Sequence, residues 1–232
     1  MLRDGLSPKE ITRSRGVNIY TTLGYLDQLV GRGDLRRSDI FFSVPKEIRN
    51  AIPISLCIGR TIEGCVNLLK KLNISADLED IIVVIKYGDS RHALGDMYED
   101  IRAIETYLHG VIGQALLDEY EGSEMGWWRQ GIPESVRKSC VLRQEEDSEP
   151  VSDPYCYTDL LDLWQIMDKR WTVFIKVLPD EMTKSKQDLR RKLVRLNTIR
   201  RNVMHPVRGV IPSEEDFEFI REFKEQLLIR PE

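Results

Sequence analysis

The residues best suited to chemistry stand near the C-terminal end of the chain, at Arg200, Arg201, Asn202 and His205. The imidazole of His205 can accept or donate a proton near neutral pH, because its reference pKa is about 6.5. An arginine side chain stays charged and holds phosphate oxygens through parallel hydrogen bonds. Together these side chains suit acid–base chemistry at a phosphate group, which requires no metal ion.

The spacing of these residues leaves open which arginine would bind phosphate. We predict a basic helix from about Ser185 to His205, ended by Pro206, because a residue before proline avoids the α conformation. In a regular helix Arg201 and His205 share a face, which makes Arg201 the phosphate ligand. If the last turn unwinds, Arg200 takes that role. The plainer interpretation of His205 is a residue whose positive charge suits a helix C-terminus.

The charges of the chain are segregated along its length. The net charge of −4 argues against a nonspecific nucleic-acid binder. Between residues 184 and 208, however, nine residues are basic and one is acidic, whereas residues 118–162 hold twelve acids and four bases. We therefore take Arg195, within the basic segment, as a candidate nucleic-acid contact. The alternative is a solvated helix face that pairs with the acidic stretch.

The N-terminal residues 1–43 are predicted to form a helix-turn-helix. Residues 7–10 form a capping box with proline at the first helical position, and Gly16 ends that helix. A second helix follows over residues 18–30, where apolar residues recur at helical spacing. Residues 35–42 are interpreted as an extended piece that forms one edge of a short wing.

This segment resembles the helix-turn-helix of bacterial regulators. The matching residues are Leu6-Ser7, Glu10-Ile11, Gly16-Val17, Thr22, Tyr25-Leu26, Leu29-Val30, Gly33 and Leu35. The resemblance implies DNA binding through residues 7–37, with the second helix in the major groove. The base-facing candidates are Asn18, Tyr20, Thr21 and Thr22, and the phosphate-binding candidates are Lys9, Arg13, Arg15, Arg36 and Arg37. A purely structural or protein-binding role is the alternative.

The rest of the chain is also predicted to be helical. Residues 44–90 are interpreted as a helical connector, with helix starts at Pro45 and Pro53. The β-branched run Ile81–Ile85 fits a buried helix or a strand, and we favour the helix because no partner strand is visible. A turn at residues 88–90 marks the domain boundary. Residues 91–232 are predicted as a bundle. Its helices are expected over residues 91–120, 133–140, 157–174, 185–205 and 213–228.

The bundle resembles HEPN domains of the Swt1-like kind. The residues that carry the resemblance are Ile104-Glu105, Leu108, Ile112, Leu116, Trp127-Trp128, Ile132-Pro133, Val136, Tyr157-Thr158-Asp159-Leu160, Asp162-Leu163, Trp171, Phe174, Leu196, Ile199-Arg200 and His205-Pro206. The resemblance implies an all-α bundle of four to five helices, usually dimeric. It also implies metal-independent cleavage of RNA by the pair Arg200 and His205. The family places asparagine directly after the arginine, whereas this chain has Arg201 there and Asn202 one position later.

These patterns lead to one functional hypothesis and one alternative. The hypothesis is a homodimeric endoribonuclease with RNA as substrate, in a prokaryotic toxin or phage-defence system with a partner protein or antitoxin. The alternative is a non-catalytic HEPN module, for dimerisation or binding, in a DNA-binding regulator or a complex subunit. We infer no cofactor and no metal site, since the histidines and cysteines lack ligand spacing. With no membrane-length apolar run and no secretory leader, we expect a cytoplasmic protein.

Overall fold

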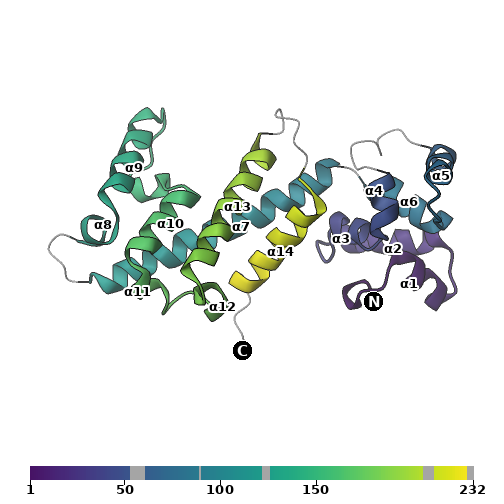
Figure 1. The fold of residues 1–232 in the computed structure, drawn as a ribbon, viewed down its shortest axis with the longest axis horizontal. Helices are drawn as coiled ribbons and strands as arrows, with labels where there is room; N and C mark the ends of the chain where they lie inside the picture. The colour runs from purple at the N-terminus through teal and green to yellow at the C-terminus, as the bar shows by residue number, and fades with distance from the viewer. Residues whose placement is uncertain (53–60, 89, 122–125, 206–211, 229–232) are drawn as a thin grey trace. The chain divides into compact units, whose positions relative to one another are not determined.

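The computed structural model describes residues 1–52, 61–88, 90–121, 126–205 and 212–228. These residues fold into helices and contain no strand, so the protein has the all-α fold expected from its sequence (Figure 1). The chain divides into two compact units, Met1–Asp96 and Met97–Glu232. No helix within the described ranges is long and apolar enough to cross a membrane.

The first unit holds a short 3-10 turn and six complete helices in its described part. They are η1 (Leu2–Asp4), α1 (Pro8–Arg15), α2 (Ile19–Gly31), α3 (Arg37–Phe42), α4 (Lys46–Ala51), α5 (Ile62–Lys71) and α6 (Leu78–Tyr87). The capping box forms as predicted: the Glu10 carboxylate accepts the Ser7 N–H at 2.7 Å, and Ser7 Oγ accepts the Glu10 N–H. Gly16, with φ at 61°, ends α1 in the left-handed region that favours glycine.

The predicted connector, residues 44–90, is not a separate part of the molecule. Ile48 of α4, Leu69 of α5 and Val83 of α6 are buried in the same apolar core as Leu23 of α2. The boundary between the two units also differs from the predicted one at residues 88–90, because the chain divides between Asp96 and Met97. The apolar run 81–85 is helical as expected. The helix start considered at Pro53 lies outside the described residues.

The predicted wing is wrong, because residues 37–42 form helix α3. The neighbouring side chains of Ile40 and Phe41 are both buried in the core, which the alternating faces of a half-exposed strand do not allow. The Asp39 carboxylate accepts the backbone N–H of Arg36 at 3.2 Å and thereby stabilises the first turn. A strand in this place would also lack a partner among the described residues.

The second unit contains most of the longest helix and all the later ones. In the described residues these are α7 (Ser90–Glu119), α8 (Gly126–Gly131), α9 (Glu134–Glu146), η3 (Pro154–Tyr157), α10 (Leu160–Lys169), α11 (Trp171–Phe174), α12 (Asp180–Thr183), α13 (Lys186–Met204) and α14 (Glu214–Leu228). Helix α9 continues six residues beyond the predicted end at Cys140. The helix predicted over residues 157–174 starts at Leu160 instead and is broken at Arg170.

The core of the second unit lies between α7, α10, α13 and α14. Buried apolar side chains recur along α7 at helical spacing, from Ile101 to Leu116, and along α13 from Leu189 to Val203. The ion pair between Lys224 of α14 and Asp100 of α7, 2.6 Å long, adds a polar link between two of these helices. Trp127 packs its ring edge-on against buried Tyr155.

Candidate nucleic-acid site

Helix α13 carries Arg200, Arg201 and Asn202, and His205 is its C-cap residue, with φ at −124° and ψ at 68°. The helix begins where Ser185 Oγ accepts the backbone N–H of Asp188 at 3.2 Å. At its other end the backbone N–H of His205 donates to the carbonyl of Arg201 at 3.2 Å. This bond has the helical i to i−4 spacing, so the last turn does not unwind before His205.

Arg201 and His205 lie one turn apart at the C-terminal end of α13. Both residues are exposed, whereas Ile199 and Val203 face the core. The helix is regular as far as Met204, and His205 is the first residue beyond it. Asn202 is half-buried beside them.

Further arginines lie on the same side of α13. Together with Arg201 and His205 they form a surface that we call the basic face. Arg190, Arg191 and Arg195 line a shallow hollow with exposed Val194 between them. Arg191 pairs with Asp188 of its own helix at 3.1 Å. The basic face comprises Arg190, Arg191, Arg195, Arg201 and His205.

Two residues of the basic face have no neutralising partner. Arg190 and Arg201 form no ion pair within the described residues, so their full charge is presented to solvent. Arg195 is held differently: it pairs with Asp216 at 3.1 Å, and its guanidinium lies 4.3 Å from the Phe219 ring centroid. This contact fixes Arg195 against α14 but leaves the residue exposed.

Arg200 belongs to a different environment from Arg201. Its Nε lies 2.7 Å from the Glu105 carboxylate of α7, and both side chains are largely buried. Burial raises the pKa of Glu105, and the charge of Arg200 opposes that rise. Arg200 and Glu105 line a pocket of about 520 Å³ that does not include His205. Arg200 thus has Glu105 as its ion-pair partner, whereas the sequence resemblance paired it with His205.

That pocket also contains two functional groups that the sequence gave no reason to choose. His109 follows Glu105 by one turn of α7; its ring stacks on Tyr155, and its Nε2 lies 3.2 Å from the Tyr155 carbonyl. Arg143 of α9 donates to the Asp162 carboxylate at 2.6 Å and to the Asp159 carboxylate at 3.3 Å. The i, i+4 spacing of Glu105 and His109 on one helix is the sequence signal that could have indicated this site.

The candidate DNA contacts of the first unit are mostly engaged within the protein. Thr22 is 3% exposed and accepts a hydrogen bond from Thr12 at 2.8 Å, so its prediction as a base contact is wrong. Arg13 pairs with Asp77 at 3.2 Å, and Arg37 lies over the Tyr87 ring.

The other candidate DNA contacts of the first unit differ in their exposure and in their contacts within the protein. Asn18 Oδ1 accepts the N–H and the hydroxyl hydrogen of Thr21 and so caps helix α2, which occupies both side chains locally. Arg36 is half-buried, and Lys9 pairs with Asp77 and Asp80. Tyr20 and Arg15 are the exposed candidates that remain.

No protein-family model matches this chain, and neither a curated protein nor a solved structure matches it. Within the described residues, no group of three or more His, Cys, Asp or Glu side chains is arranged to hold a metal ion. The proposal for the function of the protein therefore rests on the basic face, the Arg200 pocket and the helices that position them.

Proposed function

We propose that this protein is a metal-independent endoribonuclease of the HEPN kind, which holds RNA on the basic face and cleaves it at Arg201 and His205. The observation that carries the proposal is the hydrogen bond from the His205 N–H to the Arg201 carbonyl. It places two exposed residues one turn apart at the end of α13, which supports their acting together. A base and a phosphate ligand side by side are what in-line attack by a ribose 2′-OH requires.

The chemistry assigns a role to each side chain. His205 takes the proton of the 2′-OH as that oxygen attacks the adjacent phosphorus. Arg201 holds the phosphate oxygens, on which negative charge builds as the bond to the leaving 5′-oxygen breaks. The leaving 5′-oxygen takes a proton from water, and His205 later returns its proton to the solvent, so the products would be a 2′,3′-cyclic phosphate and a free 5′-OH. Asn202, half-buried next to them, is a candidate to orient either group.

The rest of the basic face supports RNA as the ligand. From Arg190 to His205 the helix rises about 22 Å, long enough to follow several phosphates of an extended strand. Arg190, which forms no ion pair in the described residues, and Arg195, which pairs with Asp216, would contact these phosphates and so position the strand at Arg201. In a symmetric homodimer, as the resemblance implies, two such faces would act on one substrate.

The proposal is tested with the purified chain, a labelled RNA oligomer and excess EDTA. We expect cleavage that leaves 2′,3′-cyclic phosphate ends. The matched control is the same oligomer with every 2′-OH methylated, which should bind equally well and stay intact because its attacking group is blocked. Cleavage of the methylated oligomer would contradict the mechanism. Binding of both oligomers with cleavage of neither would contradict the proposal that the protein is an enzyme.

Substitution of Arg190 and Arg191 together by alanine should weaken RNA binding regardless of sequence. Each lost phosphate contact lowers the slope of log affinity against log salt by about 0.7 for single strands. We therefore expect the slope to fall by about 1.4. The measurement is fluorescence anisotropy across a salt series. Arg129→Ala, at an exposed arginine of α8, is the control and should leave the slope unchanged.

A second function is favoured by the Arg200 pocket. The arginine of the family signature pairs with Glu105, and His205 does not line the same pocket. These contacts suit a non-catalytic bundle that binds RNA or a second copy of itself without cutting. Intact binding with no cleavage, in the assay above, would identify this second function.

A further inference from the structure

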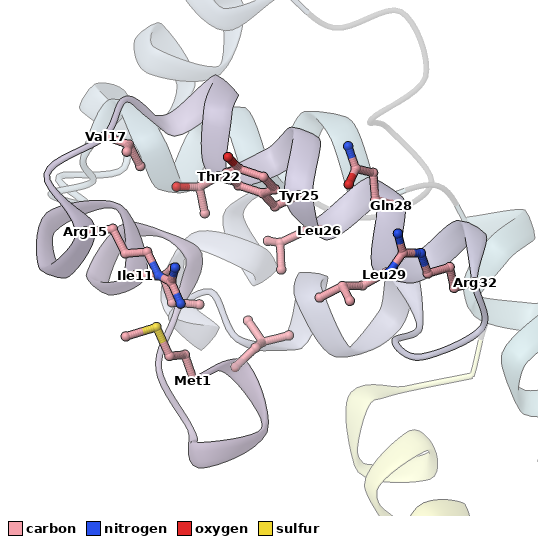
Figure 2. A pocket seen from close by; sticks show the side chains of 11 residues that line it. Met1, Ile11, Arg15, Val17, Thr22, Tyr25, Leu26, Gln28, Leu29 and Arg32 are labelled. Carbon is pink, nitrogen blue, oxygen red and sulfur yellow. The ribbon is translucent and has the colours of Figure 1, made fainter.

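A groove on the first unit lies beside helix α2. It has a volume of about 640 Å³ and is lined by η1, α1 and α2 (Figure 2). Ile11 and Leu26 are buried at its base, while Val17, Tyr25 and Leu29 stay exposed along it. Tyr25 is 61% exposed, so its ring is accessible to a ligand in the groove.

The charges at the groove are of one sign. Arg15 at the end of α1 and Arg32 just after α2 lie on opposite sides of its apolar centre (Figure 2). No acidic residue lines the groove, and neither arginine forms an ion pair within the described part of the chain. Two free guanidinium groups flanking an apolar strip complement a ligand with an apolar centre between carboxylates.

The groove occupies the surface that a DNA-reading helix would use. Tyr25, Leu29 and Arg32 lie on the exposed side of α2, where major-groove contacts would have to come from. DNA interfaces are more polar and more positively charged than protein interfaces. Two of the predicted base contacts, Thr22 and Asn18, are already engaged within the protein. An apolar strip with two arginines therefore fits a protein better than a duplex.

We propose that this groove binds an amphipathic helix of a partner protein, with apolar side chains along one face and carboxylates at both ends. Tyr25 and Leu29 would pack against the apolar face, as aromatic anchors do at the centre of protein interfaces. Arg15 and Arg32 would each bind a carboxylate and so hold both ends of the helix in the groove. This inference does not depend on the RNA chemistry of the second unit.

The test uses the full chain and a labelled synthetic peptide of about 14 residues, roughly 21 Å as a helix. The probe has leucines at i, i+3, i+4 and i+7 and glutamates at both ends. A second peptide keeps the leucines and replaces the glutamates by lysines. We expect saturable binding of the glutamate peptide, and at least tenfold weaker binding of the lysine peptide.

Two sets of variants locate the binding. Tyr25→Ala should weaken binding of the glutamate peptide by about tenfold or more. Tyr20→Ala is the matched control, because Tyr20 is 65% exposed on the same helix but does not line the groove. The double variant Arg15→Glu with Arg32→Glu should reverse the preference and bind the lysine peptide. That reversal also shows that the variant is folded.

Several results would overturn the proposal. One is the absence of saturable binding of the glutamate peptide up to on the order of 1 mM. Another is equal loss of binding in the Tyr25 and Tyr20 variants. A third is binding of duplex DNA that Arg15→Glu with Arg32→Glu abolishes, which would assign the groove to nucleic acid.

Discussion

Substitution of His205 by alanine should lower the rate of RNA cleavage by about 10²–10⁴-fold, the range that general acid–base groups contribute. RNA affinity should stay within a factor of about two to three, because an exposed residue at a helix end contributes little to the fold and the arginines of the basic face remain. The measurement is single-turnover cleavage with saturating protein, so that the chemical step is observed apart from binding.

His109→Ala is the informative control for that result. His109 lines the pocket with Arg200, whereas His205 does not. If His109→Ala abolished cleavage and His205→Ala did not, the active site would be the pocket, and the assignment to the basic face would be wrong. The arginines divide in the same way: Arg201→Ala should lower the cleavage rate by about 10²–10³-fold, as loss of a charge-stabilising donor does. Arg200→Ala should affect cleavage less.

Substitution of Asp162 by alanine should destabilise the second unit strongly. The Asp162 side chain is 6% exposed and lies 2.6 Å from the Arg143 guanidinium; it also accepts the backbone N–H of Asp159 at 3.1 Å. Removal of one partner from a buried pair usually costs about 3–5 kcal/mol. Because Arg143 keeps access to water, we expect about 2–4 kcal/mol here.

Urea unfolding followed by tryptophan fluorescence measures this effect in one unit alone. All four tryptophans of the chain, at positions 127, 128, 164 and 171, belong to the second unit. Asp168→Ala is the matched control, since Asp168 pairs with Lys186 at 2.9 Å on the surface, where such pairs contribute about 1 kcal/mol or less. Equal losses in the two variants would mean that burial of the Asp162 pair adds nothing.

Local sequence signals predicted the helices well where a cap and an apolar period agreed. The capping box at Ser7, the terminator Gly16 and the basic helix ending at His205 all lie where the sequence indicated. The prediction was wrong at residues 35–42, because a short apolar run has no period long enough to separate a strand from a helix. There the burial of both Ile40 and Phe41 decides for the helix.

The candidate site was predicted only in part, for a similar reason. The sequence identified Arg200, Arg201 and His205 but left the register open, and the two arginines differ in the structure: Arg200 pairs with Glu105, whereas Arg201 is exposed. The sequence did not predict that Arg143 and His109 line the same pocket as Arg200 and Glu105. These residues come from separate helices, and no spacing along the chain predicts their meeting.

The sequence by itself therefore determined the all-α class, most of the helices and the concentration of basic residues on one of them. Those properties depend on residues within a few turns of one another, through periodicity, capping and local charge. The tertiary structure decided which arginine is exposed and which is paired. It also decided that residues 44–90 share a core with the N-terminal helices, and that an apolar groove flanked by Arg15 and Arg32 stays open beside α2. Each of these depends on burial between distant segments, which only packing determines.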